Sequence, residues 1–216
     1  YVTAAKQLVS LKEVAIDMPA GPSEVEVIAD ESANPAFIAA DFLSQAEHGV
    51  DSQAMLVTAS ESIVEPVMQA IREQLDRLPR KEITEKSLSH SRLIVLKDKQ
   101  EVIDFTNLYA PEHLIIQTTD YADIAGQVEN AGSVFMGPYT PESAGDYASG
   151  TNHTLPTNGY AKAYSGVNLD SFIKKITFQE ITADGIRLLG GTIRTMAANE
   201  QLDAHKNAVT IRLNTL

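Results

Sequence analysis

The stretch that decides the fold is residues 25–49, VEVIADESANPAFIAADFLSQAEHG. It opens with a short run of β-branched and apolar residues, which is typical of a buried strand. Asn34 and Pro35 then form an N-cap and first-turn pair, and apolar residues recur at helical spacing until Gly49, which suits a helix end. The stretch therefore predicts a strand followed by a helix, the repeating unit of an α/β protein.

The same alternation continues along the chain. Four further short apolar runs predict strands at residues 55–58, 92–96, 114–117 and 133–136. Helices are expected between them, from about residue 61 to 77 and from about 101 to 109. Near-continuous apolar strands that alternate with helices favour a mostly parallel sheet covered on both faces. We therefore predict an α/β fold with flanking helices.

The amino-acid composition of the sequence changes at Pro138. Residues 138–153 are rich in Gly, Pro, Ser, Thr and Asn, and long irregular segments of this kind often carry function. Beyond them, an alternating run at residues 172–178 predicts another strand, and helices are expected at about 182–198 and 200–213. The last part of the chain is therefore expected to be a mainly helical tail appended to the sheet.

Composition excludes several classes of protein. The chain has 17 Lys and Arg against 29 Asp and Glu, a formal net charge of −12, which argues against a nucleic-acid or anionic-membrane binder. It has no Cys, so disulfides, thiolate zinc sites and a catalytic thiol are excluded, and a reducing cytoplasm is the expected compartment. No apolar run reaches the ~18–20 residues of a membrane span, and no signal peptide opens the chain. Because the first residue is Tyr1 rather than Met, we expect a piece of a longer protein.

Two pairs of polar residues stand at element ends. Gln45 and His48 are three apart, so they share one face of the last helical turn, where the helix dipole favours a cation. The alternative is an ordinary amphipathic helix that ends in a polar turn. Glu112 and His113 put a carboxylate beside an imidazole between a helix and a strand, a combination suited to proton transfer if the pair lies in the turn. The alternative is a solvated polar pair.

The remaining candidates are weaker on the residues alone. Asp146 and His153 lie in the irregular segment, where each could simply form a turn. Glu200 and His205 are five apart and do not share a helix face, so His205 would by default be an exposed tail residue. The sequence contains none of the glycine-rich motifs that bind nucleotide phosphates. Residue reasoning therefore predicts an α/β domain with a candidate metal site built from His, Asp and Gln.

Five motifs, taken in order, carry a resemblance to a known family. They are DMPAGPSEV (17–25), LSQAEHG (43–49), NLYAPEHL (107–114), GDYASGTNHTLPT (145–157) and LDAHKNA (202–208). Together they closely resemble histidinol dehydrogenase, and the likeness runs along nearly the whole chain. The resemblance implies an incomplete Rossmann-like domain, because members of that family are about twice this length.

The resemblance also implies an activity, the last step of histidine biosynthesis. That activity is the four-electron oxidation of L-histidinol to L-histidine, through an aldehyde, with two NAD⁺ used in turn. By motif, Gln45, His48, Asp146 and His205 correspond to the family's zinc ligands, and the metal would orient the substrate. Zinc and manganese both suit such donors. His113 corresponds to the base that takes the alcohol proton, and Glu112 to the residue that activates water.

The resemblance extends to substrate contacts and assembly. Ser23, His153 and Glu200 match substrate-contacting positions, beside the four metal ligands and His113. The implied organisation is a remnant of an N-terminal, NAD-binding lobe at 1–21, a zinc- and substrate-binding domain at 22–165, and a tail at 166–216 that crosses to the other subunit of a homodimer. Glu200 and His205 would then complete the neighbour's site, while most NAD⁺ contacts would lie outside this chain. The alternative is a catalytically silent zinc-binding or assembly fragment.

Overall fold

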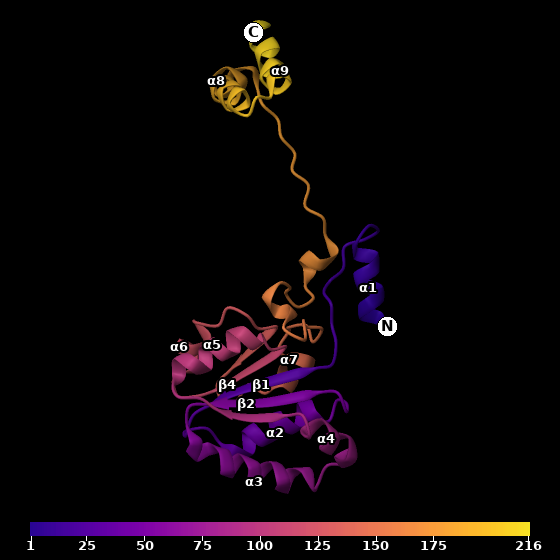
Figure 1. Ribbon diagram of the computed structural model, residues 1–216, viewed down its shortest axis with the longest axis vertical. Coiled ribbons are helices and arrows are strands. Elements are labelled where there is room, and N and C mark those ends of the chain that lie inside the picture. The colour runs from indigo at the N-terminus through magenta and orange to yellow at the C-terminus, as the bar shows by residue number, and fades with distance from the viewer. The chain divides into compact units, whose positions relative to one another are not determined.

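The computed structural model describes all residues, 1–216, as two compact units, Tyr1–Ile173 and Lys174–Leu216 (Figure 1). The first unit holds one sheet of five strands: β1 (Glu24–Ala29), β2 (Gln53–Thr58), β3 (Arg92–Val95), β4 (His113–Gln117) and β5 (Ser133–Met136). All neighbouring strands pair in parallel, in the order β3-β2-β1-β4-β5. The predicted α/β fold with a mostly parallel sheet is confirmed.

Helices cover both faces of this sheet, as the near-continuous apolar strands require. The helices of the first unit are α1 (Val2–Ser10), α2 (Pro35–Ala46), α3 (Val64–Leu75), α4 (Lys81–Leu88), α5 (Lys99–Tyr109), α6 (Tyr121–Ala125) and α7 (Glu142–Tyr147). In Figure 1, α2, α3 and α4 lie on one side of the strands, and α5 and α6 lie on the other. Strand alternation divides the core accordingly: Val25 and Val27 pack toward α2, whereas Ile28 packs toward α5.

Helix α2 determines where its last residues lie. Asn34 caps its start by accepting a hydrogen bond from the Ala36 N–H at 2.9 Å, and Pro35 fills the first position. A helix that connects two parallel strands runs antiparallel to them, so its C-terminal end returns to the edge where the strands begin. We call this edge of the sheet the amino edge, and the opposite edge, where the strands end, the carboxyl edge. Gln45, in the last turn of α2, therefore lies at the amino edge.

Three features differ from the sequence predictions. Residues 172–178 are not a strand: a short 3₁₀ turn, Leu169–Phe172, leads into a segment that joins no sheet. Alternation predicts a strand only where a neighbouring strand offers its backbone groups, and this segment has no such neighbour. The predicted helix at 61–77 is a 3₁₀ turn followed by α3, and α4 was not predicted. Helix α7 forms within the segment that was predicted to be irregular.

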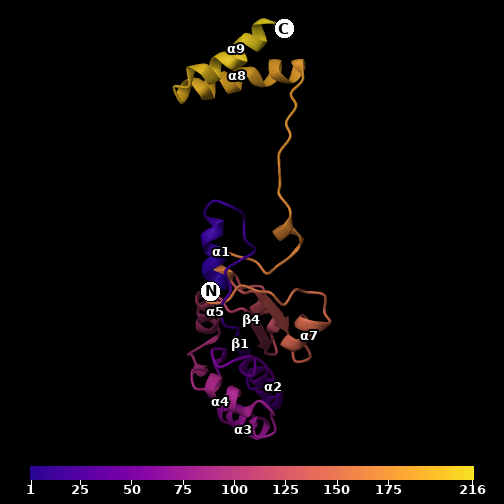
Figure 2. The same ribbon diagram turned by 90° about the vertical axis from the view of Figure 1, so that its right-hand side faces the viewer.

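The second unit is a pair of helices, α8 (Ala183–Asn199) and α9 (Asp203–Asn214), which run alongside each other in Figure 2. The Thr182 hydroxyl caps α8 by accepting from the Gly185 N–H at 3.1 Å. Gly190 permits close packing, because a Cβ there would lie 2.7 Å from Leu213 Cδ1. Leu188, Met196 and Ile211 remain exposed. The unit confirms the predicted helical tail.

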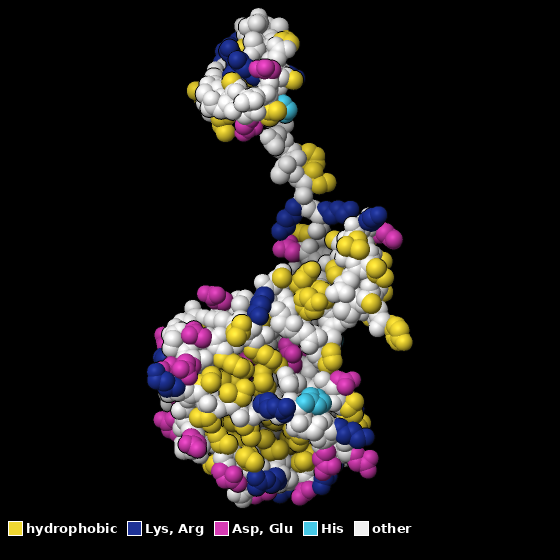
Figure 3. Space-filling model, viewed as in Figure 1, with side chains coloured by type: hydrophobic (Ala, Val, Ile, Leu, Met, Phe, Trp, Pro, Cys, Tyr) yellow, Lys and Arg dark blue, Asp and Glu magenta, His cyan; other side chains and the backbone are white.

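Two surface properties complete the fold. None of the helices is both long enough and apolar enough to cross a lipid bilayer. Hydrophobic side chains gather over the middle of the first unit, between α5 and α3, on the face seen in Figure 3. Strand β3 is an edge of the sheet with Val95 exposed, and Leu108 on α5 is 71% exposed. Apolar surface of this extent marks a place where other protein can bind.

Candidate functional site

Glu112 and His113 lie where α5 turns into β4. Ala110 ends the helix in the left-handed conformation, with φ of 57°, and Pro111 follows it. His113 is the first residue of β4, whereas Glu112 precedes the strand, so the two side chains are not forced to opposite faces. His113 Nδ1 lies 3.6 Å from Glu112 Oε2, and each residue is only 4% exposed. The pair is therefore a buried carboxylate and imidazole in contact.

The neighbouring strand holds the backbone of this turn. The Ser133 N–H donates to the Glu112 carbonyl oxygen at 2.9 Å, and the Gly132 N–H donates to the Pro111 carbonyl oxygen at 2.9 Å. A Cβ at Gly132 would lie 2.5 Å from the Glu112 carbonyl oxygen, so only glycine allows this approach. The start of β5 thus fixes Glu112 in place.

The environment of Glu112 favours its protonated form. The pKa of Glu112 is raised to about 8. Burial is the largest cause and the negative charges of Glu24 and Glu142 add to it, whereas hydrogen bonds from the Glu24 N–H and from Ser23 act in the opposite direction. A carboxyl with a pKa near neutrality is suited to taking up and releasing a proton. The contact also places Ser23, a predicted substrate residue, directly beside the pair.

A second group of side chains forms a candidate metal centre. His48, Glu142 and Asp146 each offer a ligand atom, and these atoms all lie within 4.8 Å of one another. Glu142 and Asp146 are four apart on α7, so they share one face of that helix. Gly145 lets α7 approach the sheet closely, since a Cβ there would lie 2.6 Å from Phe135 Cε1. The Phe135 ring in turn lies 5.9 Å from the His113 ring, measured between centroids.

Several buried polar atoms at the amino edge have no hydrogen-bond partner. Gln45 is fully buried, and neither its amide oxygen nor its amide nitrogen has a hydrogen-bond partner. Glu142 Oε2 and His113 Nε2 are also buried and unpartnered. Each such atom costs about 1–3 kcal/mol of stability unless something binds it. A divalent cation of the zinc type accepts imidazole nitrogen and amide or carboxylate oxygen, so the residues present fit a metal.

The charges near the group also favour a cation. The pKa of His48 is raised, first by its contact with Glu142, whose Oε1 lies 3.7 Å from His48 Nε2. Asp41 lies one helical turn before Gln45, and burial together with the Glu142 charge raises its pKa to about 7. Gln117 donates to Asp41 Oδ2 at 2.7 Å. Several acidic groups thus converge near His48, an arrangement that favours a bound cation.

The structure does not unite all the predicted site residues. His153 is exposed and makes no hydrogen bond or ion pair with the group. Glu200 and His205 are exposed residues of the second unit and stay predictions as site residues. Glu142 was missed, because it lies in the segment predicted to be irregular. Its spacing of four from Asp146 is the signal that could have found it, had a helix been expected there.

A parallel α/β domain with a buried carboxylate–imidazole pair and a candidate metal centre at one edge has features found in metal-dependent enzymes. Comparison with known proteins identifies the family to which this domain belongs. The histidinol dehydrogenase family model matches residues 1–213. The histidinol dehydrogenase of Bacteroides thetaiotaomicron is 70% identical over 216 residues, covering 100% of this chain and 50% of the relative. The chloroplastic histidinol dehydrogenase of Arabidopsis thaliana is 58% identical, covering 100% of this chain and 47% of the relative.

A solved structure agrees with these relatives. The crystal structure of histidinol dehydrogenase from Elizabethkingia anophelis matches with a TM-score of 0.95 and 58% identity, covering 100% of this chain and 50% of that one. The chain therefore belongs to the histidinol dehydrogenase family. It spans about half the length of the relatives that it matches.

Proposed function

We propose that this chain is the zinc- and substrate-binding half of a histidinol dehydrogenase. The activity is the NAD-dependent oxidation of L-histidinol to L-histidine through an aldehyde, a four-electron reaction that completes histidine biosynthesis. The observation that carries the proposal is that α7, which holds Glu142 and Asp146, packs through Gly145 on Phe135, whose ring also lies beside His113. Family membership supplies the substrate.

The proposed metal ligands of this chain are Gln45, His48 and Asp146, with His205 supplied by a second copy of the chain. The unpartnered amide of Gln45 and the convergence of His48 with Asp146 support this set. Zinc held by these residues would supply a positive centre that orients the substrate. Glu142 lies close enough to His48 to hold that imidazole or to add a carboxylate oxygen.

The two buried residues of the pair would handle the protons. His113 accepts the alcohol proton at Nε2, an atom that is buried and has no other partner. Glu112 takes a proton from the water that attacks the aldehyde, and Ser23 hydrogen-bonds to its carboxyl group. His153 and Glu200 are proposed to contact the substrate with Ser23. Because the pKa of Glu112 is raised to about 8, the step that needs its ionised form should slow as the pH falls through that value.

The organisation of the complete enzyme is part of the proposal. Residues 1–21 would belong with an NAD-binding lobe outside this chain, residues 22–165 would carry the zinc and substrate, and residues 166–216 would reach a second subunit. Exposed apolar residues on α8 and α9, such as Leu188, support a partner surface for the tail. NAD⁺ would be held mainly by residues outside this chain and accept the hydride.

A second candidate is an assembly fragment that binds zinc without catalysing the reaction. The half-length match to the relatives favours it. The apolar surface between α5 and α3 (Figure 3) would bind the other half of an enzyme whether or not this chain catalyses the reaction.

One assay separates the two candidates. NADH formation from L-histidinol and NAD⁺ is measured with this chain alone and with the N-terminal half of the Bacteroides relative added. We expect NADH only with both halves. The His113→Asn variant should then lower kcat by about 10²- to 10⁴-fold while its zinc content, measured by elemental analysis, stays unchanged. Zinc binding without NADH under either condition would support the fragment instead.

A further inference from the structure

The main chain of Glu24 contacts both members of the Glu112–His113 pair. Its N–H donates to Glu112 Oε2 at 2.9 Å, and its carbonyl oxygen lies 3.2 Å from His113 Nδ1. Glu24 is the first residue of β1, the central strand, and the adjacent Val25 is in register with His113. A single residue therefore fixes two side chains that come from a different strand and turn.

The contact to His113 determines which nitrogen of the imidazole carries the proton. A carbonyl oxygen can only accept a hydrogen bond, so Nδ1 must be the donor and must be protonated. In the neutral ring, Nε2 then keeps its lone pair. Nε2 is buried and has no partner, so it is the atom left available as a base. The Glu24 carbonyl thus selects the tautomer that proton abstraction requires.

The side chain of Glu24 ties this main-chain position to two other segments. Its Oε1 accepts from the Asn158 N–H at 3.1 Å, and its Oε2 accepts from the Tyr109 hydroxyl at 3.3 Å. The same hydroxyl lies 2.8 Å from Gln53 Oε1 on the neighbouring strand. Tyr109 is the last residue of α5, three positions before Glu112. The carboxylate therefore links the start of β1 to the turn that carries the pair.

Glu26 provides an internal comparison. It lies two residues further along β1 and points to the same face of the sheet. It is fully buried and accepts a hydrogen bond from the Thr106 hydroxyl. Neither its side chain nor its main chain hydrogen-bonds to the side chain of Glu112 or His113. Glu26 is therefore a buried carboxyl on the same strand and face as Glu24 but without hydrogen bonds to the side chains of the pair.

We propose that Glu24 is a positioning residue for the oxidation step: its main chain orients Glu112 and sets the His113 tautomer, and its carboxylate holds that main chain in place through Tyr109 and Asn158. The catalytic part of this proposal rests on the proposed histidinol dehydrogenase function. The tautomer and its dependence on Glu24 do not, because they are properties of the chain itself.

The tautomer is measured by nuclear magnetic resonance on the full chain with ¹⁵N-labelled histidine rings. The chain has five histidines, and the signal of His113 is identified by its loss in His113→Asn. We expect a neutral ring protonated at Nδ1 in the metal-free protein at pH 8. In Glu24→Ala, that state should lose population to the Nε2-protonated form, whereas Glu24→Gln should keep it. A wild-type ring protonated at Nε2 would overturn the proposal.

Kinetics of the enzyme assembled from both halves test the consequence. Glu24→Ala should lower kcat by about 10- to 100-fold, the usual loss when a residue that orients a functional group is removed, with KM for histidinol and zinc content unchanged. Glu24→Gln should recover most of kcat. It should also move the acid limb of the pH profile to lower pH, because the Glu24 charge is one of the charges, with Glu142, that raise the pKa of Glu112.

Glu26→Ala is the matched control. It should weaken folding but leave the His113 tautomer and kcat unchanged, so equal effects of Glu24→Ala and Glu26→Ala would contradict the positioning role. If Glu24→Ala does not fold, Tyr109→Phe is the substitute variant, because it removes only one hydroxyl that anchors Glu24. It should shift the His113 tautomer and kcat in the same direction by a smaller amount. The absence of any shift would overturn the proposal. A wild-type assembly without NADH formation, together with the Nδ1 tautomer, would refute the proposed function and leave the positioning intact.

Discussion

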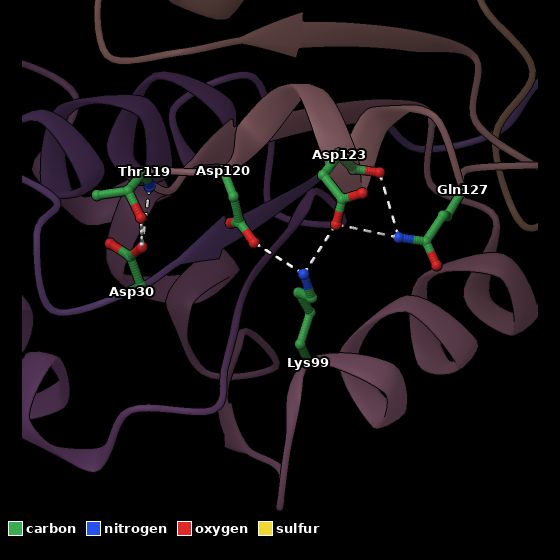
Figure 4. A network of polar contacts seen from close by, with 6 residues as sticks. All are labelled: Asp30, Lys99, Thr119, Asp120, Asp123 and Gln127. Carbon is green, nitrogen blue, oxygen red and sulfur yellow. Dashed lines mark hydrogen bonds and ion pairs between the residues drawn. The ribbon is translucent and has the colours of Figure 1, made fainter.

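The two edges of the sheet differ in the polar groups that they bring together. At the carboxyl edge, Lys99 Nζ lies 2.9 Å from Asp120 Oδ2 and 2.8 Å from Asp123 Oδ2 (Figure 4). The Thr119 N–H donates to Asp30 Oδ2 at 2.9 Å in the same network. The two carboxylates, Asp123 first, raise the pKa of Lys99. These exposed groups satisfy one another.

At the amino edge, several buried polar atoms are not satisfied by other groups of the protein. Gln45, Glu142 and His113 each keep at least one buried side-chain atom without a partner. Ligands of open parallel sheets usually bind at the carboxyl edge, where the strand order reverses, here between β1 and β4. A cavity of about 290 Å³ does lie there, beside Asp30, Lys99 and Thr118. Gln117 Oε1 and Thr118 Oγ1, at the carboxyl end of β4, are also buried without a partner. Only at the amino edge, however, do such atoms belong to a group of His, Glu and Asp ligand atoms and to a carboxylate–imidazole pair. The convergence of these groups, rather than the position of a cavity, indicates the candidate functional edge.

The largest effect on the proposed metal centre is expected from His48→Ala. Loss of an imidazole ligand should weaken zinc binding by more than about 100-fold, the upper range for residues that merely support a ligand. The measurement is a zinc titration against a competing chelating dye. His90→Ala is the control, since His90 also lies near the amino edge but hydrogen-bonds the Ser52 carbonyl oxygen at 2.9 Å and is outside the group. Equal affinities of the two variants would remove His48 from the site.

The dependence of the free energy of unfolding on pH tests whether a buried carboxyl of the sheet is protonated in the folded chain. Burial raises the pKa of Glu26 from 4.5 to about 8. Between these values the unfolded chain has lost the proton that the folded chain keeps, so the free energy of unfolding should fall as the pH rises from about 4.5 to about 8 and then level off. Glu26→Gln should remove part of this slope and stabilise the metal-free chain at pH 8 by on the order of 2–3 kcal/mol.

Urea unfolding of the metal-free chain at several pH values provides this measurement. The exposed Glu129→Gln variant is the control for the loss of one acidic group from a chain of net charge −12. Identical slopes in the wild type and Glu26→Gln would show that Glu26 is not held protonated in the folded state.

Glu142→Gln tests the residue that sequence reasoning missed. The substitution keeps the shape of the side chain and removes the charge that faces His48. We expect zinc affinity to fall by about 10- to 100-fold. The pKa of His48 in the metal-free chain should also fall toward its ordinary value, because Glu142 is the main cause of its rise. A titration of the His48 ring by nuclear magnetic resonance measures the second effect, and an unchanged affinity and pKa would exclude Glu142 from the centre.

The smallest effect is expected at the carboxyl edge. Lys99→Met removes an exposed cation from a network of surface ion pairs, which contribute little to stability and less at high salt. The Tm should fall slightly at low salt, and zinc affinity should not change. A calorimetric scan at two salt concentrations checks the first expectation. A loss of zinc binding in this variant would contradict the division between the two edges.

Much of the fold could be predicted because its signals are local. The run from Val25 to Gly49 specifies a strand and a capped helix by itself, and four similar runs specify the remaining strands. The extended segment at 172–178 shows the limit of this reasoning. Its alternation resembles that of a strand, but pairing depends on a neighbour that the local sequence does not encode.

The candidate site could be predicted only in part. Gln45 and His48 share a helix turn and are recognisable by spacing, whereas Asp146 joins them only because Gly145 lets α7 pack on Phe135. Such a long-range contact is invisible in the sequence. Glu142 was hidden for the same reason, since its helix forms in a segment rich in helix-breaking residues. The roles of His205 and Glu200 rest on the family resemblance, because they belong to the second unit.

Anomalous diffraction at the zinc absorption edge, from crystals of this chain grown with Zn²⁺, tests the assignment of the amino edge most directly. We expect a peak at about 2.0–2.2 Å from Gln45 Oε1, a His48 ring nitrogen and an Asp146 carboxylate oxygen. A zinc ion held instead at the Lys99 edge, or no ordered ion within reach of those three side chains, would contradict it.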